Sequence, residues 1–261
     1  MTIASSPASH AEILPLRELY RQELDCQIVH DCAHDRGGCV EWHLLRRDGE
    51  IASYGAVWIG PYWMEKGSLF EFYVLPEFRT SLFPLFEKLI ASTNPTRIYA
   101  QTNDPFLSVL IFDYIQSTVV GHILFDDKTK TNLVIESAVL RRAAPEDKER
   151  IFEHKVEPVG DWLLEFGGRI VATGGVLNHY NRPYGDIFME VHPDFRRRGF
   201  GSYLVQELKA ECRRAGSVPA ARTRPTNLAS RRTLERAGFA PCARLIWGDV
   251  LGQAQAVMTG P

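Results

Sequence analysis

Residues 191–202 read VHPDFRRRGFGS, and this stretch decides how the rest of the chain is interpreted. It follows an apolar segment that ends at Val191, and it opens a segment at about 199–215 whose apolar residues recur at helical spacing. Gly199 and Gly201 remove side chains where the helix begins. The first amides of a helix have no partner within it and lie at the positive end of its dipole. Such a strand, loop and helix are suited to bind a pyrophosphate.

The residues that follow this loop decide between two interpretations of it. A glycine-rich turn beside solvated arginines would also contain R-x-x-G-x-G, the string that stands at 196–201. Here an N-x-x-S motif follows at 227–230 and a Gly-Phe pair at 238–239. In this order the motifs resemble those of the GNAT superfamily of acyl-CoA-dependent N-acyltransferases, over roughly residues 134–250. The pattern is not the Rossmann fingerprint, because the spacing differs and no acidic residue stands at the ribose position.

The resemblance implies a binding site for acetyl-CoA as co-substrate. In the GNAT fold, the strand before the loop splays from the strand after the helix, and the acyl-CoA extends the sheet within that gap. The amides of residues 197–202 would then hold the pyrophosphate, Asn227 would hydrogen-bond to pantetheine, and the N–H of Val191 would face the thioester carbonyl. The residues assigned to acetyl-CoA are Val191, His192, Arg196, Arg197, Arg198, Gly199, Phe200, Gly201, Ser202, Asn227, Ser230 and Arg231.

Two acidic residues before the loop are candidates for the general base that an attacking amine requires. Glu190 directly precedes Val191, and Asp186 lies four residues earlier, so both share one face of a strand. Glu190 is also suited to a structural role, as a carboxylate paired with an arginine. The N–H of Val191 is the third catalytic candidate, because the thioester oxygen gains negative charge during attack. His192 titrates in the useful range, but its place beside the phosphate loop favours a solvated turn histidine.

One departure from the family pattern concerns the group that protonates the leaving thiolate. Many GNAT enzymes have a tyrosine seven residues after the motif asparagine, whereas this chain has Leu234. Tyr180 and Tyr184 precede the third strand and are predicted to line the acceptor pocket. We expect an N-acetyltransferase that acts on a primary amine of a small molecule or peptide by direct attack. The alternatives are a non-catalytic acyl-CoA-binding regulatory module and an interaction scaffold that binds no ligand.

The chain also repeats itself. The matching segments are 74–79 with 191–196, 48–57 with 167–176, and 102–103 with 226–227, at offsets of 117, 119 and 124. The alternative is two unrelated α/β stretches with similar turns. The repeat predicts an α+β protein of two GNAT-like lobes, 1–132 and 133–261. Each lobe would contain a mixed, mostly antiparallel sheet flanked by helices, and the second lobe would have a splayed parallel strand pair at the acyl-CoA site.

The first lobe lacks the glycines that would let a cofactor approach the backbone. Leu82 and Pro84 stand where the second lobe has Gly199 and Gly201. Their side chains would block the approach, and proline has no N–H to donate. The first lobe is therefore predicted to be degenerate, with a structural or acceptor-site role. The acceptor-site role is suggested because residues 151–161 leave little room for a covering helix in the second lobe.

Hydrophobic periodicity and turn residues predict the elements of each half. The helices expected are 11–23, 145–154, 199–215 and 228–237, and the strands of the second half are 161–166, 170–177, 186–191, 219–223 and 243–250. Between the halves, residues 126–133 are polar, which is typical of either a linker or a hairpin turn.

Composition excludes several classes of protein. The 261 residues are 45% apolar and 24% charged with a net charge of −2, which is typical of a globular chain and lacks the basic excess of a nucleic-acid binder. Residues 1–7 do not resemble a secretory signal, and no apolar run reaches the ~18 residues of a membrane helix. Five cysteines do not suggest a disulfide framework, so the predicted location is cytoplasmic. The expected partners are acetyl-CoA and an amine acceptor, without nucleic acid or membrane, for a monomer or homodimer.

Potential zinc ligands are dense near the N-terminus, namely Cys26, His30, Cys32, His34, Cys39 and His43. Their spacings, C-x5-C-x6-C and H-x3-H, match no paired-knuckle pattern. Ordinary buried cysteines and solvated histidines account for them more simply, so no metal is expected.

Overall fold

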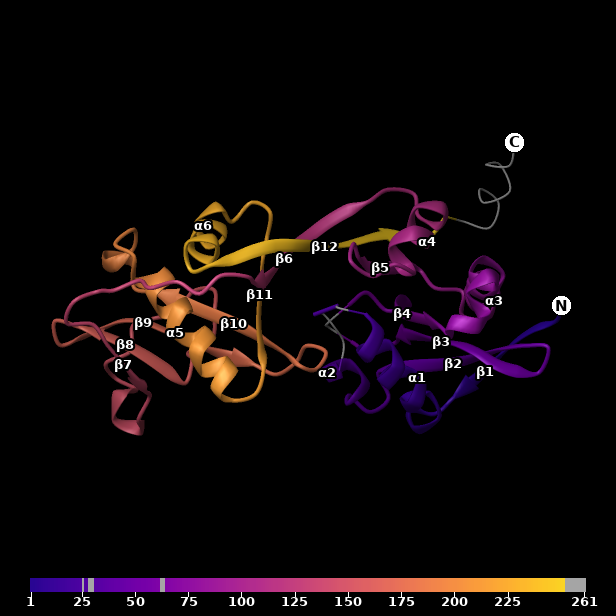
Figure 1. The fold of residues 1–261 in the computed structure, drawn as a ribbon, viewed down its shortest axis with the longest axis horizontal. Coiled ribbons are helices and arrows are strands. Elements are labelled where there is room, and N and C mark those ends of the chain that lie inside the picture. The colour runs from indigo at the N-terminus through magenta and orange to yellow at the C-terminus, as the bar shows by residue number, and fades with distance from the viewer. Residues whose placement is uncertain (25, 28–30, 62–63, 252–261) are drawn as a thin grey trace. The chain divides into compact units, whose positions relative to one another are not determined.

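The computed structural model describes residues 1–24, 26–27, 31–61 and 64–251. These residues form two compact units (Figure 1). Unit 1 comprises residues 1–121 and the chain from 243 onward, and unit 2 comprises residues 122–242. No helix in the described ranges is long and apolar enough to cross a membrane.

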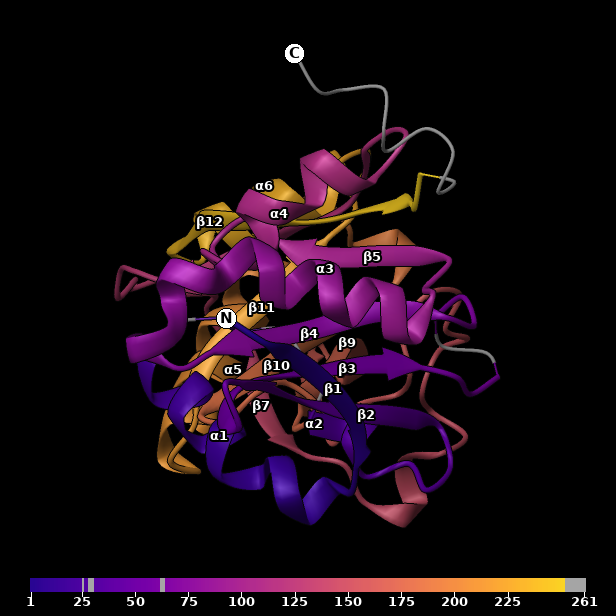
Figure 2. The ribbon, with the colours of Figure 1, turned by 90° about the vertical axis from the view of Figure 1, so that its right-hand side faces the viewer.

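Unit 1 is a sheet with helices on both faces. Its elements are β1 (Ile3–Ala8), α1 (His10–Glu23), α2 (Asp31–His34), β2 (Val40–Arg47), β3 (Glu50–Trp58), β4 (Ser68–Val74), the 3-10 turn η1 (Pro76–Ser81), α3 (Leu82–Thr93), β5 (Arg97–Gln101), α4 (Leu107–Tyr114), the start of β6 (Val119–Asp127) and most of β12 (Phe239–Asp249). The strand order is β1-β2-β3-β4-β5-β12, and only β4 and β5 are parallel. Figure 2 shows α3 running along the sheet of this unit.

Unit 2 repeats this plan with fewer helices. Its further elements are β7 (Val139–Arg142), the 3-10 turn η2 (Pro145–Asp147), β8 (Trp162–Phe166), β9 (Arg169–Leu177), β10 (Tyr184–Val191), the 3-10 turn η3 (Pro193–Phe195), α5 (Phe200–Arg214), β11 (Val218–Thr223) and α6 (Leu228–Arg236). The strand order is β6-β11-β10-β9-β8-β7, and only β10 and β11 are parallel. The predicted α+β class, with mostly antiparallel sheets flanked by helices, is confirmed.

The same close contact attaches one helix to the sheet in each unit. In unit 1, a Cβ at Gly55 would lie 2.3 Å from Leu89 of α3. In unit 2, a Cβ at Gly174 would lie 2.9 Å from Leu208 of α5. Both pairs are related by an offset of 119, so the repeat extends from the sequence to the packing of helix on sheet.

The helix predicted at 145–154 is wrong. Only η2 forms there, and the chain from 151 to 160 is irregular. At the end of this turn, the carboxylate of Asp147 accepts hydrogen bonds from Arg141 at 2.6 Å and from the N–H of Ala144 at 2.9 Å. Further on, the backbone N–H groups of 155–157 donate to Glu190 of β10, so they are not available for helical hydrogen bonds. The other predicted helices and strands correspond to observed elements, with ends shifted by a few residues.

The chain passes between the units within two strands. The division expected at residues 132 and 133 follows chain order, whereas the compact units divide inside β6 and inside β12. The reason is pairing, because Leu245–Asp249 of β12 lie beside Arg97–Gln101 of β5 in unit 1. Residues 128 and 129, in the polar stretch expected to be a linker or hairpin turn, instead donate their N–H groups to the carbonyl of Gly238 within unit 2.

Candidate functional site

The central strands of unit 2 separate as they approach the glycine-rich loop. β10 and β11 pair only at Tyr184–Asp186 with Val218–Ala220. Beyond this point β10 stays paired with β9 as far as Val191, while β11 stays paired with β6 as far as Thr223. The predicted splayed parallel pair is therefore confirmed, and it opens a gap on the β11 side of β10.

The register of β10 gives its backbone groups a direction. The N–H of His192 donates to the carbonyl of Val171 at 2.9 Å, which places this pair on the β9 side. Backbone groups alternate along an antiparallel strand, so the N–H groups of Val191 and Met189 point to the opposite side, into the gap. This is the direction that the proposed role of the Val191 amide requires.

The loop after β10 adopts backbone conformations that expose helix amides. Arg197 and Gly199 have φ of 62° and 89°, and Gly199 is the N-cap of α5 without a side-chain cap. The first helical hydrogen bond runs from the N–H of Tyr203 to the carbonyl of Gly199. The amides of Phe200, Gly201 and Ser202 therefore have no acceptor within the helix, at the positive end of its dipole.

The second glycine of the motif allows close packing. A Cβ at Gly201 would lie 3.2 Å from Thr233 of α6 and 3.3 Å from Val191 of β10. The absent side chain therefore lets α5 approach both elements. At Gly199, in contrast, an added Cβ would meet only the tip of Arg236 at 3.9 Å, so its positive φ explains the glycine there.

The three arginines of the loop differ in what they touch. Arg196 donates from Nε to the carbonyl of Val191 at 3.0 Å. The guanidinium of Arg198 lies 5.2–5.8 Å from the ring centroids of Phe166, Phe195 and Phe200, a cation–π contact that holds it in place. All three side chains are exposed, but Arg196 and Arg198 have these contacts, so Arg197 is the one with most freedom to meet a phosphate.

His192 has a structural role in the turn. Its Nδ1 accepts the N–H of Asp194 at 3.2 Å, which caps η3. Its ring packs edge-on to Phe152 and Phe195, at centroid distances of 5.2 and 5.7 Å. The structure places this residue beside the loop, as expected, with the contacts of a turn histidine.

The motif residues on α6 begin that helix. Oδ1 of Asn227 accepts the N–H of Ser230 at 3.0 Å, so the carboxamide oxygen is a helix N-cap and only its NH2 group remains as a donor for a ligand. Nε of Arg231 lies 3.5 Å from Glu235 one turn further on. Leu234, at the usual tyrosine position, is 4% exposed and belongs to the apolar core of unit 2.

Glu190 is held by backbone groups on the face of the sheet opposite α5. Its carboxylate accepts N–H groups from Lys155, Val156 and Glu157 at 3.0–3.3 Å. Burial alone would raise the pKa of Glu190, but these N–H groups and the nearby His154 lower it below the ordinary value. Glu190 therefore stays anionic, and it fixes the irregular segment over the sheet.

Asp186 lies on the same face as Glu190, as predicted from strand alternation. Its Oδ2 is 3.0 Å from Nε2 of His179 and 3.7 Å from Nε of Arg222. Tyr180 is 3% exposed, and burial together with the charge of Asp186 raises its pKa well above the ordinary value. Tyr180 thus lies near the predicted acceptor face, with its ring under Arg222 at 5.8 Å.

Sequence reasoning missed Glu157, a carboxylate of this cluster whose pKa is raised above its ordinary value. The causes are burial and then the charges of Asp186 and Glu190, partly offset by Arg222 and His154. His154 is also new to the site, since its Nε2 lies 3.1 Å from Oγ1 of Thr173 on β9. Both residues belong to the irregular segment, where the helix predicted at 145–154 included His154 but gave no sign that either residue reaches this face.

The corresponding loop of unit 1 has no such geometry. η1 runs directly into α3, and Leu82 is right-handed with φ of −50°, where Gly199 is left-handed. Pro84 lies in the first turn of α3 and offers no N–H. The amide arrangement found at α5 is therefore missing at α3.

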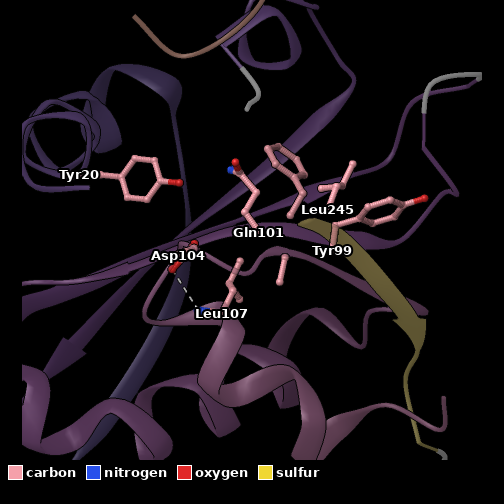
Figure 3. Close-up of a pocket in the computed structure, with 8 residues that line it drawn as sticks. Tyr20, Tyr99, Gln101, Asp104, Leu107 and Leu245 are labelled. Carbon is pink, nitrogen blue, oxygen red and sulfur yellow. Dashed lines mark hydrogen bonds between the residues drawn. The ribbon is translucent and has the colours of Figure 1, made fainter. Parts of the chain in front are cut away.

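The gap beside β4 in unit 1 is also narrowed by side chains. β4 and β5 pair only at Ser68 and Leu69 with Arg97 and Ile98, and a small pocket lies beyond that point. Figure 3 shows Tyr20, Gln101 and Asp104 around it. Asp104 accepts the N–H groups of Phe106 and Leu107 at the start of α4, and burial raises its pKa to about 7.

The histidines and cysteines near the N-terminus have other contacts. Nε2 of His34 lies 3.4 Å from Glu71, and its Nδ1 accepts from Trp42 at 2.8 Å. His43 lies 3.3 Å from Ser5, and Cys26 donates to the carbonyl of Asn103. No three potential ligands gather as a metal site in the part of the chain that the structure describes. His30 of the zinc alternative lies outside the described residues.

Comparisons with known proteins agree with this geometry. Residues 131–239 match the family model described as Acetyltransferase (GNAT) family. No curated protein matches the chain in sequence. Similar solved structures are an acetyltransferase from the GNAT family from Colwellia psychrerythraea (TM-score 0.72, 16% identity, 96% of this chain and 100% of that one), a GCN5-related N-acetyltransferase from Sphaerobacter thermophilus (0.58, 17%, 95% of each), and a tandem GNAT protein from the clavulanic acid biosynthesis pathway (0.58, 12%, 96% and 99%).

At these identities the structures show a shared fold, over nearly the whole of both units. The family model covers the strand, the loop and the helix that carry the open amides. The chemistry of this family is acyl transfer from an acyl-CoA. Residues 131–239 therefore belong to the GNAT acetyltransferase family, and the chain as a whole shares the fold of GNAT proteins, including a tandem one.

Proposed function

We propose that the chain is an N-acetyltransferase that transfers an acetyl group from acetyl-CoA to a primary amine by direct attack. One observation carries the proposal: the gap beside Val191 lies between the open amides of α5 and the carboxylates of β10. Unit 2 would be the catalytic lobe, and unit 1 would be a degenerate lobe that binds no acyl-CoA. A cytoplasmic location and a monomeric or homodimeric state remain predictions.

The residues of unit 2 fit acetyl-CoA in both charge and shape. The amides of Phe200, Gly201 and Ser202, with the side chain of Arg197, supply donors for a pyrophosphate. The NH2 group of Asn227 and the backbone edge of β10 supply partners for the pantetheine amides. When bound, acetyl-CoA supplies the thioester carbonyl that the amine attacks.

The protein has to hold the amine and accept its proton. The carboxylates of Asp186 and Glu190 are the groups that would attract an ammonium to the gap. Glu157 is the proposed general base, because its raised pKa brings it closest to the range in which a carboxylate takes a proton near neutral pH. Glu190 positions Glu157 by accepting a hydrogen bond from the backbone N–H of Glu157.

The remaining task is to stabilise the carbonyl oxygen as it gains negative charge. The N–H of Val191 points into the gap and is the proposed donor. Removing one such donor typically lowers kcat by roughly 100–1,000-fold. Leu234 lies in the apolar core and takes no part in proton transfer.

The competing function is an acyl-CoA-binding regulatory module without turnover. It is favoured by one observation, since the usual tyrosine is replaced by the buried Leu234. The two functions differ in what an amine does to the complex. Release of free CoA from acetyl-CoA in the presence of a panel of amines supports the enzyme, whereas binding of acetyl-CoA without release for any amine supports the module.

The role of Glu157 is tested by Glu157→Gln, with Glu153→Gln as a control in the same segment. Glu153 is exposed, so its loss is expected to change nothing. We expect Glu157→Gln to lower kcat by about 100-fold, within the range for general-base catalysis, with unchanged acetyl-CoA affinity. In the parent chain kcat should rise with pH as Glu157 loses its proton, above the pH at which an ordinary glutamate would do so. A variant that keeps this pH profile and rate would remove Glu157 from the mechanism.

A further inference from the structure

Cationic side chains lie beside the acidic ones on the open face of unit 2. Asp186 of β10 pairs with Ala220 of β11, so alternation places Arg222 on the same face, two residues further along. Arg224 follows directly after the end of β11 at Thr223, near enough for its charge to act on His122. Arg222 in turn pairs with Leu124 of β6, which places His122, two residues before Leu124, on this face as well.

Arg222 is positioned without being buried. Its Nε lies 3.7 Å from Oδ2 of Asp186, and its guanidinium carbon lies 5.8 Å from the ring centroid of Tyr180. The side chain is 34% exposed. A carboxylate binds a guanidinium best through two parallel N–H groups, and an arginine held at its Nε can present its terminal nitrogens in this way.

His122 gives an independent sign of a missing partner. Its Nδ1 is buried and has no hydrogen-bond partner among the residues that the structure describes. Burial, followed by the charges of Arg222 and Arg224, lowers its pKa, so the imidazole is neutral at pH 7 and can donate one hydrogen bond. A buried polar atom of this kind ordinarily has a partner.

Among the residues that the structure describes, the aligned position on β5 of unit 1 carries no cation. Leu69 of β4 aligns with Asp186 at the offset of 117, and it pairs with Ile98 of β5 as Asp186 pairs with Ala220. Ala100 therefore stands where unit 2 has Arg222. The cation at this position therefore occurs in the unit with the open loop and is not shared by the two units.

We propose that the acceptor is an amino acid, that is, a primary amine with a carboxylate a few bonds away. This rests on the proposed function, because it names the acceptor class of the same site. The ammonium would lie beside Asp186 and Glu190, and the carboxylate beside Arg222, Arg224 and His122. The 3.7 Å between Asp186 and Arg222 matches two opposite charges carried close together on one molecule. A doubly charged phosphate is less suited, because the three carboxylates of the cluster would repel it.

The test compares the twenty amino acids with their carboxamides and their decarboxylated amines, using the full chain and saturating acetyl-CoA. Release of CoA gives kcat/KM for each probe. We expect at least one amino acid to exceed its own carboxamide and amine by about tenfold or more, the effect of one charge-assisted pair. Equal or higher values for the carboxamide and the amine would overturn the proposal.

Arg222→Gln then tests the residue assigned to the carboxylate. It should abolish the preference by raising KM for the amino acid, while kcat/KM for the matched amine changes little. A merely structural role would lower both values together and would contradict the assignment. Arg222→Lys should restore part of the preference, since it keeps the charge but not the fork. Arg214→Gln, an exposed arginine of α5 in the same unit, is the control.

A direct binding measurement separates this proposal from the proposed function. If no probe releases CoA although acetyl-CoA binds, the proposed function fails. Calorimetric titration of the full chain with the amino acids and their carboxamides still decides the acceptor class. Tighter binding of an amino acid supports it, and equal binding of the two probes overturns it.

Discussion

Units 1 and 2 each place a carboxylate on the same face of corresponding strands, but different groups surround the two carboxylates. In unit 1, Glu71 of β4 lies under α1, where Arg17 donates to both of its oxygens at 2.7 and 3.1 Å and Tyr54 donates at 2.5 Å. In unit 2, Glu190 of β10 lies under an irregular segment that offers it backbone N–H groups.

The difference depends on the segment that covers the face. α1 is a complete helix of 14 residues and closes the face of unit 1 with apolar side chains and a buried ion pair. The matching segment of unit 2 fails to form a helix, so Glu157 and Arg222 remain partly accessible. One loss of regular structure therefore separates a sealed face from one that stays partly exposed.

The largest expected effect comes from breaking the sealed face. Glu71→Gln leaves Arg17, which is 1% exposed, without its main partner. We expect a loss of about 3 kcal/mol or more in the free energy of unfolding, as for other broken buried pairs. Glu190→Gln should cost about 1 kcal/mol, because its partners are backbone N–H groups that a carboxamide oxygen can still accept. Urea unfolding of both variants measures the difference, and equal losses would contradict the contrast between the faces.

The next effect concerns the loops. Gly199→Asp adds a negative charge and a side chain at the open amides of α5, so acetyl-CoA affinity should fall by roughly 100-fold, the loss of one or two hydrogen bonds to a charged group. Pro84 of α3 in unit 1 aligns with Gly201 of unit 2, and Pro84→Ala should leave that affinity unchanged. Calorimetric titration with acetyl-CoA checks both. Retained affinity in Gly199→Asp would show that the binding site lies elsewhere.

An effect that depends on pH is expected at Asp104 of unit 1. Burial raises its pKa from 3.8 to about 7, so the folded chain binds this proton more tightly than the unfolded chain does. Its contribution to stability is therefore complete below about pH 4 and is lost as the pH rises through about 7. The loss amounts to at most about 4 kcal/mol, at 1.36 kcal/mol per unit of pKa.

Asp104→Asn keeps an oxygen for the N–H groups of Phe106 and Leu107 and removes the titration. The variant should be more stable than the parent at pH 8, and its stability should depend less on pH between 4 and 8. Asp113→Asn, on the exposed side of α4, is the control and should change neither. A parent chain whose stability does not fall over this range would refute the assignment.

The sequence predicts the parts of the molecule whose causes are local. Residues close together in the sequence determine the strand that ends at Val191, the glycines of the loop and the apolar stripe of α5. The structure has these features where they are expected. The repeat also predicts that the two halves have similar sheets. In the structure, Gly55 and Gly174 have the same contact with a helix.

The parts that escape prediction depend on residues far apart in the chain. The helix expected at 145–154 is only a short turn, and the irregular chain that follows it is fixed by Glu190, more than thirty residues later, which accepts the N–H groups of residues 155–157. The raised pKa of Glu157 arises from burial and two carboxylates on another strand. Asn227 appears in a ligand-binding motif, yet only the structure shows that its oxygen caps α6.

The path of the chain through β6 and β12 has a consequence for how the protein is made. Unit 2 is one continuous stretch of the chain. Unit 1 begins first, but Leu245–Asp249 of β12 complete its sheet beside β5. Domains generally fold as units during synthesis. The sheet of unit 1 can therefore be completed beside β5 only after every residue of unit 2 has been translated.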